Sequence, residues 1–253
     1  MPEKFDIKKF IEYKKSVERE RPILSVEPRI ITIDGVDGVG KSSVGQKIFD
    51  GLRRRYGEGT VVIANKLIGP EQKRLQKLIN DKNLTNRKQI DNIYSAMINR
   101  MYKEIIVPAL NAGKIVIIDR SEIDILRYAL ESGEKDLIER RKKQIQEGAL
   151  THRLWAGNRV FLQASVEDIE RNLSQRMQIW PSDPKTRDEI EKRKNMEKEA
   201  EKEILSMPCA GETNIIKKEN KRCDDRGERE VYLEKLAEEI IEELNLPDEK
   251  VKL

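Results

Sequence analysis

The sequence lacks the features that define several classes of protein. Its 253 residues include two cysteines, Cys209 and Cys223, which are too few for a disulfide framework, and nothing else indicates an oxidising compartment. No run of about 18 apolar residues is present, which argues against a membrane-spanning helix. The N-terminus, MPEKFDIKKF, has no apolar segment of the kind found in secretory signals. We therefore expect a soluble, cytoplasmic protein.

A large excess of one charge sign is also missing. The 50 basic and 46 acidic residues give a net charge of +4, whereas a strongly basic nucleic-acid binder would have a larger excess. We expect neither nucleic acid nor membrane as a partner. Charged residues make up 38% of the sequence, against roughly 25% in an average protein, and the 37% of hydrophobic residues still suffices for a core. The single histidine, His152, and the cysteines form no pattern that indicates chemistry.

Short apolar runs rich in β-branched residues alternate with stretches of helical periodicity. The runs predict strands at residues 29–34, 60–64, 114–119, 159–164 and, more weakly, 213–217. Helices are predicted at residues 41–56, 86–110 and 228–244. Gly113 stops the second helix, Pro108 kinks or ends its last turn, and Ser165 with Asp168 resembles a capping box that opens a further helix. Since the strands are almost free of polar residues and helices intervene, we expect a doubly wound α/β domain with a parallel five-stranded sheet flanked by helices.

The first residues differ in composition from this domain. Residues 1–28 are rich in Lys and Glu with sparse apolar positions, and we predict a helical extension there, followed by one domain over residues 29–253. The most charged stretch, residues 183–205, is interpreted as a solvated helix.

The most specific motif is GVDGVGKS at residues 35–42, two glycines separated by four residues and followed by Lys and Ser. It lies between a predicted strand and a predicted helix, so that backbone N–H groups and the positive end of the helix can bind phosphate oxygens. Lys41 brings a mobile charge to the transferred phosphate, and the Ser42 hydroxyl can ligate Mg²⁺. The motif predicts a site for ATP and Mg²⁺. The residues expected to bind the nucleotide are Gly35, Val36, Asp37, Gly38, Val39, Gly40, Lys41, Ser42 and Ser43.

Two carboxylates accompany this loop. Asp37 would be repelled by bound phosphates unless it serves an acceptor hydroxyl or an ordered water, and the alternative is a turn residue that bonds to its own backbone. Asp119-Arg120-Ser121 directly follows a predicted strand, and ligands of open α/β sheets bind outside the carboxyl ends of the strands. We therefore expect Asp119 to hold Mg²⁺ through water and Arg120 to bind a phosphate. A structural ion pair between these two residues is the alternative.

The segment IITIDGVDGVGKSS, followed at a distance by NR…VPALNAGKIVIIDR, resembles the thymidylate kinase family of nucleoside monophosphate kinases. The likeness covers roughly residues 29–128, with weaker similarity in RVFLQASVEDIERNLSQR. It implies a P-loop kinase fold and a homodimer that uses ATP and Mg²⁺. It also implies that Asp37 contacts the acceptor sugar, Arg120 the acceptor phosphate and Arg100 the acceptor base.

The sequence departs from the family at three places. Where the family has Arg-Glu-Pro after its second strand, Asn-Lys-Leu stands here, so that Lys66 either binds the acceptor phosphate instead or is a solvated lysine. Ala96 occupies the position of the family's base-stacking aromatic residue, and Tyr94 is predicted to pack in the core. Ser121 replaces the usual aromatic residue, which makes Asp-Arg-Ser similar to the Glu-Arg-Ser of deoxynucleoside kinases.

The phosphate loop contains no arginine, and family members of that kind stabilise the transferring group with an arginine from a mobile lid. Arg187 matches the Arg-x-Glu pattern of the lid, which we place near residues 177–205, and Arg176 is a second candidate. An exposed salt bridge on a helix is the alternative for Arg187.

These features predict a kinase that transfers a phosphoryl group from ATP to a nucleoside monophosphate, with dTMP as the leading acceptor. The expected catalytic residues are Lys41, Arg120, Asp37 and Arg187, and the expected acceptor-binding residues are Asp37, Arg100, Arg120 and Lys66. Two alternatives stay open, a deoxynucleoside kinase and a nucleotide-binding regulatory protein without an acceptor.

Overall fold

The structure is a computed structural model, and it describes residues 25–65, 87–119, 121–175, 184–223 and 225–247. Five strands in this part of the chain form one sheet in the order β2-β3-β1-β4-β5. They are β1 (Ser25–Asp34), β2 (Val61–Asn65), β3 (Ile115–Asp119), β4 (Leu154–Gln163) and β5 (Asn214–Glu219). Every neighbouring pair is parallel. The predicted fold class, a doubly wound α/β sheet, is confirmed.

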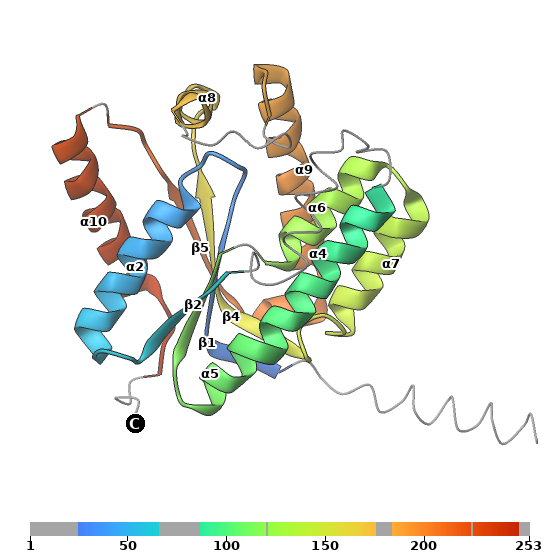
Figure 1. The fold of residues 1–253 in the computed structure, drawn as a ribbon, viewed down its shortest axis with the longest axis horizontal. Coiled ribbons are helices and arrows are strands. Elements are labelled where there is room, and N and C mark those ends of the chain that lie inside the picture. Colours follow the sequence, from blue (N-terminus) through green and yellow to red (C-terminus); the bar gives the residue numbers. More distant parts are fainter. Residues whose placement is uncertain (1–24, 66–86, 120, 176–183, 224, 248–253) are drawn as a thin grey trace, which may run out of the picture.

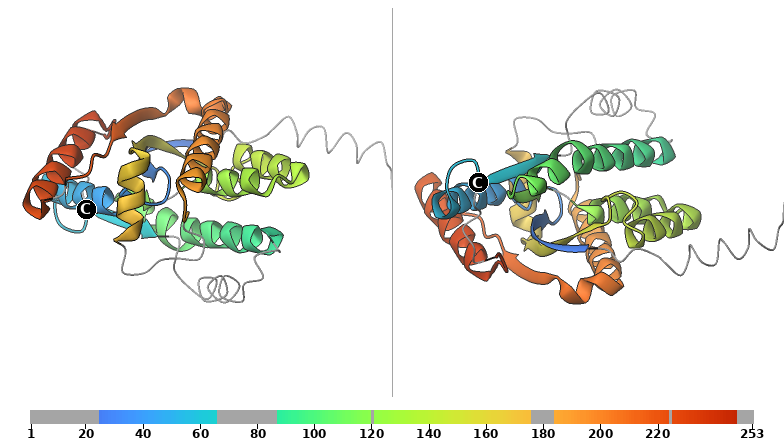
Figure 2. Two further views of the ribbon diagram at one scale, coloured as in Figure 1. Left: turned by 90° about the horizontal axis from the view of Figure 1, so that it is seen from above. Right: turned by 90° about the horizontal axis from the view of Figure 1, so that it is seen from below.

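Helices cover both faces of the sheet (Figures 1 and 2). On one face lie α2 (Lys41–Tyr56) and α10 (Arg226–Glu243). On the other face are α4 (Arg87–Met101), α6 (Glu122–Ser132), α7 (Lys135–Gln146) and α9 (Arg187–Leu205). None of the helices in the described ranges combines the length and the apolar character that crossing a membrane requires.

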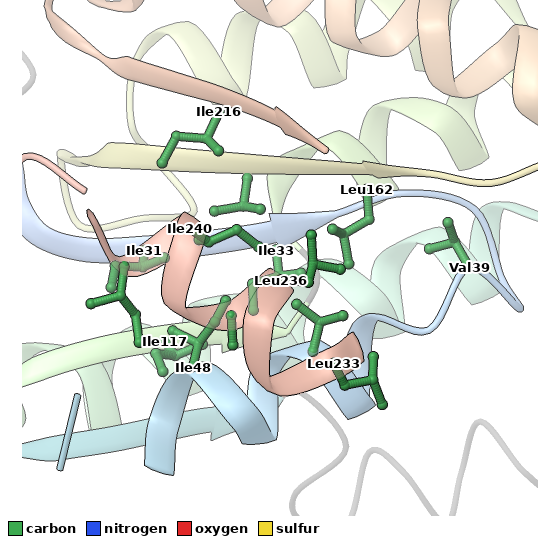
Figure 3. Close-up of a cluster of buried hydrophobic side chains, with 14 of the residues drawn as sticks. Ile31, Ile33, Val39, Ile48, Ile117, Leu162, Ile216, Leu233, Leu236 and Ile240 are labelled. Atoms are coloured by element: carbon green, nitrogen blue, oxygen red, sulfur yellow. The ribbon is translucent and has the colours of Figure 1, made fainter. Parts of the chain in front are cut away.

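The largest part of the core lies between the sheet, α2 and α10 (Figure 3). Val44, Ile48 and Leu52 of α2 are completely buried, and their spacing of four residues places them on one face of the helix. Burying each of these side chains contributes roughly 1.5–3 kcal/mol. The helix ends before Gly57, as its periodicity predicts, and its first residue, Lys41, follows the phosphate-loop motif directly.

The first strand is longer than the sequence predicts. Residues 25–28, predicted as part of a helical extension, pair with β4 instead, so that part of the prediction is wrong. Pro28 interrupts the apolar pattern, and the sheet tolerates it because the register between β1 and β4 shifts between Glu27 and Ile31. Gly157 of β4 permits this close approach, since a Cβ there would lie 2.5 Å from the Cα of Pro28. Residues 1–24 lie outside the described part.

The long predicted helix continues through Pro108 with a change of winding. After α4 comes a π-helical turn, η1 (Tyr102–Ile106), and then the short helix α5 (Val107–Asn111). Pro108 has no N–H for the carbonyl four residues earlier and its ring crowds that carbonyl, which explains a wider turn at this point. Gly113 then terminates the helix with a φ of 72°, as predicted.

The helix expected after β4 is α8 (Val166–Ser174), and the predicted cap is confirmed, because the Ser165 side chain accepts a hydrogen bond from the Asp168 N–H at 3.0 Å. The expectation of a solvated helix over residues 183–205 is wrong for one face of α9. Ile190, Ala200 and Ile204 are buried there. A 3-10 turn, η2 (Pro208–Glu212), connects α9 to β5.

Candidate functional site

The phosphate-loop motif connects β1 to α2 and is held in shape from outside. The side-chain amide of Asn172 on α8 donates to the Gly38 carbonyl at 2.8 Å, and that of Asn220 after β5 donates to the Val39 carbonyl at 2.6 Å. Gly38 and Gly40 have φ values of 91° and 93°, which favour glycine. The loop therefore has the strand-loop-helix context that the motif predicts for phosphate binding.

Lys41 is buried and folded back onto the loop. Its Nζ donates to the carbonyl oxygens of Gly35 and Val36, the second at 3.0 Å, and lies 4.0 Å from the Asp37 carboxylate. A lysine ammonium on a flexible stem at this position can exchange those carbonyls for phosphate oxygens.

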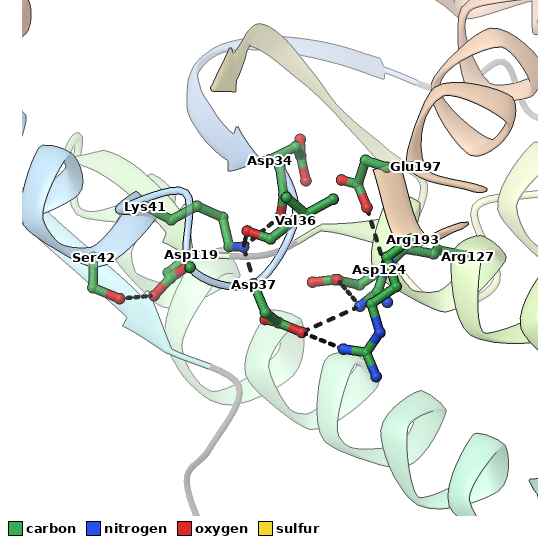
Figure 4. A network of polar contacts seen from close by, with 12 residues as sticks. Asp34, Val36, Asp37, Lys41, Ser42, Asp119, Asp124, Arg127, Arg193 and Glu197 are labelled. Carbon is green, nitrogen blue, oxygen red and sulfur yellow. Dashed lines mark hydrogen bonds and ion pairs between the residues drawn. The ribbon is translucent and has the colours of Figure 1, made fainter. Parts of the chain in front are cut away.

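Ser42 and Asp119 meet because β1 and β3 are neighbours in the sheet. The Ser42 hydroxyl donates to Asp119 Oδ2 at 3.1 Å (Figure 4). The other oxygen, Asp119 Oδ1, is buried and has no hydrogen-bond partner within the described part of the chain. A hydroxyl, a carboxylate and an unused buried oxygen are the kinds of donor that suit Mg²⁺, directly or through water. The two residues predicted to hold the metal fit that role.

Asp37 lies in a cluster of buried charges contributed by α6 and α9. Its Oδ2 is 3.1 Å from Nη1 of Arg193 and 4.0 Å from Nη2 of Arg127 (Figure 4). Arg127 is 1% exposed, and it also pairs with Asp124 at 3.0 Å and with Glu197 at 3.1 Å. The alternative that Asp37 only bonds to its own turn does not account for these partners.

Burial raises the pKa of the Glu197 carboxyl to about 7, against the opposing effect of the Arg127 charge. Glu197 also lines a cavity of about 460 Å³ that adjoins the start of the phosphate loop at Gly35 and Val36 and extends between the end of β4 and α9. Open space and a titrating carboxyl thus lie beside the loop.

Sequence reasoning missed Arg127 and Arg193. A signal for Arg127 was available, because Asp124 and Glu131 stand three residues before it and four after it, on the same helix face. For Arg193 the four-residue spacing to Glu197 was the only local hint. Its contact with Asp37 spans 156 residues of sequence and follows from the packing of α9.

Two predicted residues lie apart from this cluster. Arg187, the first residue of α9, pairs with Glu167 and with Glu170 at 3.6 Å, both on α8, and its side chain is 53% exposed. Arg100 pairs with Glu104 at 3.1 Å along its own helix. The described contacts connect neither residue to the phosphate loop.

Three further candidates, Lys66, Arg120 and Arg176, lie outside the described residues. Tyr94 packs between helices, as predicted, with its ring stacked on Tyr128 of α6 at 4.8 Å between centroids. Ala96 is exposed.

Comparison with known proteins agrees with this geometry. Residues 33–150 match the family model described as thymidylate kinase. The thymidylate kinase of Desulfotalea psychrophila is 30% identical over 102 residues, which are 40% of this chain and 49% of that protein. The chain thus spans about half the length of this curated relative.

Among solved structures, the thymidylate kinase of Ehrlichia chaffeensis superimposes with a TM-score of 0.56 at 16% identity, over 86% of this chain and 98% of that one. At this identity the likeness shows a shared fold.

Proposed function

We propose, because residues 33–150 match the thymidylate kinase family in sequence, that the protein transfers the γ-phosphoryl group of ATP to a nucleoside monophosphate, and that dTMP is the preferred acceptor. The observation that carries this proposal is the junction of β1 and β3, where Ser42 of the phosphate loop lies 3.1 Å from Asp119. The junction brings a triphosphate-binding loop next to the Asp-Arg corner, where a second phosphate would bind.

On the ATP side, residues 35–43 would hold the triphosphate with backbone N–H groups and the N-terminal end of α2. Lys41 would leave the Gly35 and Val36 carbonyls and neutralise charge on the transferred group. Ser42 and Asp119 would hold Mg²⁺, which when bound supplies positive charge between the phosphates.

On the acceptor side, Arg120 and Lys66 would bind the monophosphate, Arg100 the base and Asp37 the sugar. Arg193 and Arg127 support this role of Asp37, because two guanidinium groups fix the carboxylate beside the loop and keep it ionised among phosphates. In-line transfer needs little covalent chemistry from the protein, so the rate would depend on orientation and charge neutralisation.

The test is release of ADP in a coupled assay with dTMP, dUMP, UMP, CMP, dCMP or the corresponding nucleosides. We expect turnover with dTMP above the other monophosphates and none with a nucleoside. Turnover with thymidine instead would indicate a deoxynucleoside kinase. ADP release independent of any acceptor would indicate a nucleotide-binding regulator.

Lys41→Ala tests the ATP side, and we expect it to lower kcat at least 100-fold, on the scale of losing one charged group at the transition state, without unfolding the protein. Lys47→Ala on the same helix is the matched control, since Lys47 pairs with Glu230 and Glu234 of α10 and not with the loop. Equal activity of the two variants would contradict the proposal. Light scattering on the purified chain would test the homodimer that the family resemblance implies.

A further inference from the structure

A second buried polar network lies beneath the corner between β3 and α6, apart from the Asp37 cluster. It joins Asp34 at the end of β1, Ser121 and Glu122 at the start of α6, and Arg159 of β4. All four residues are at most 3% exposed. None of them is among the residues that we propose to touch ATP, Mg²⁺ or the acceptor.

Ser121 is the centre of this network. Its hydroxyl donates to Asp34 Oδ1 at 2.7 Å and accepts the Ile123 N–H at 3.2 Å, so that it also caps α6. Its backbone N–H is 3.3 Å from the same Asp34 oxygen. The residue that follows Asp119 and Arg120 in the chain is therefore fastened to the strand that leads into the phosphate loop.

Arg159 completes the fastening from the neighbouring strand. Its Nη1 donates to the Ser121 hydroxyl at 3.3 Å, and its Nη2 donates to Glu122 Oε2 at 3.2 Å. The Trp155 ring lies 4.6 Å from the guanidinium carbon, and Tyr102 of η1 donates to the other Glu122 oxygen at 3.3 Å. A planar guanidinium can reach both partners at once, which a lysine ammonium on its flexible stem cannot reproduce.

Burying these charges costs free energy, and apolar residues of similar size would often give an equally stable core. The cost is visible at Asp34, because burial raises the pKa of its carboxyl to about 6 although Arg159 and Ser121 act in the opposite direction. What such a network does provide is a fixed geometry between β1, β4 and the first turn of α6. A shift of about 1 Å at a reacting centre can lower a rate 100-fold, so fixed geometry matters at this corner.

We propose that Arg159 is a positioning residue, which acts through Ser121 to fix the Asp119–Ser121 corner against the phosphate loop. The inference rests on the proposed phosphotransferase activity. It assigns a role in acceptor use to a side chain that does not touch the acceptor.

The test compares Arg159→Lys with Arg141→Lys in the full-length protein. Arg141 of α7 is buried to the same degree, at 2% exposure, and none of its printed partners belongs to either site. We expect Arg159→Lys to lower kcat/KM for dTMP about ten-fold, the scale of a hydrogen bond to a charged group, with an unchanged Kd for ATP. Arg141→Lys should leave kcat/KM unchanged even where both variants have lower melting temperatures.

A second pair of variants keeps the test decisive if Arg159→Lys does not fold. Ser121→Ala removes the hydroxyl that both Asp34 and Arg159 contact, and Ser121→Thr retains it. We expect loss of kcat/KM for dTMP in the first variant and recovery in the second. Wild-type kinetics in Arg159→Lys or Ser121→Ala would overturn the positioning role alone, whereas a wild-type protein that transfers no phosphate would overturn the proposed function and this inference with it.

Discussion

Arg193 and Arg187 lie six residues apart on α9, and their surroundings differ. Arg193 contacts the phosphate-loop carboxylate of Asp37 at 3.1 Å and is 17% exposed, whereas Arg187 pairs with Glu167 and Glu170 on the surface. An exposed ion pair contributes little free energy, while a guanidinium beside the phosphate loop can act on developing charge. The arrangement favours Arg193 as the arginine of α9 that supports transfer.

We predict that Arg193→Ala lowers kcat on the order of 100-fold, because one charge-stabilising donor is lost near the transferred group. Arg187→Ala is the matched control on the same helix, and its kcat should stay within about two-fold of wild type because it loses a surface pair. Steady-state kinetics at saturating ATP and dTMP measure both. The opposite order of effects would restore Arg187 as the lid arginine that the sequence predicts.

At the scale of a single helix, the capping of α8 is determined locally. Ser165 accepts the Asp168 N–H at 3.0 Å, and both residues could be identified from the sequence because a cap involves neighbours three positions apart. The π turn before Pro108 was only partly predictable. The proline indicated a disturbance, but whether the helix would end or change its winding depends on Tyr102 and Ile106, which pack in the core.

We predict that Ser165→Ala lowers the free energy of unfolding by about 1 kcal/mol, since one N–H of the first turn loses its acceptor. Urea denaturation followed by circular dichroism measures the change. Ser165→Asp should retain most of the stability, because a carboxylate also caps and favours the helix N-terminus. If the alanine and aspartate variants were equally stable, the cap would not contribute.

At the scale of the whole molecule, buried carboxyls couple folding to pH. Burial raises the pKa of Glu197 to about 7 and that of Asp34 to about 6, above their ordinary values of 4.5 and 3.8. A group of this kind binds its proton more tightly in the folded protein than in the unfolded chain. Its contribution to the free energy of unfolding therefore falls as pH rises from about 4.5 to about 7 for Glu197, and from about 3.8 to about 6 for Asp34.

We predict that Glu197→Gln removes the fall above pH 6 and leaves the part due to Asp34. The charged groups that act on Glu197 are Arg127, Asp124, Lys41 and Asp34, and all of them stay in the variant. Urea unfolding between pH 4.5 and 7.5 measures the slope, on a unit scale of about 1.4 kcal/mol per pKa unit. Glu199→Gln, an exposed position on the same helix, is the control and should keep the wild-type slope. An identical slope in both variants would refute this assignment.

Local sequence determined the fold class, the phosphate loop, the metal pair of Ser42 and Asp119, and the cap at Ser165. Each depends on adjacent residues, on periodicity, or on the rule that parallel strands end at one edge of a sheet. Strand order and the partners of buried charges were decided only by tertiary structure. Arg193 meets Asp37 across 156 positions, and Arg159 meets Ser121 across 38. No local pattern encodes such contacts, because they form only when separate helices and strands pack against one another and exclude water from the charges between them.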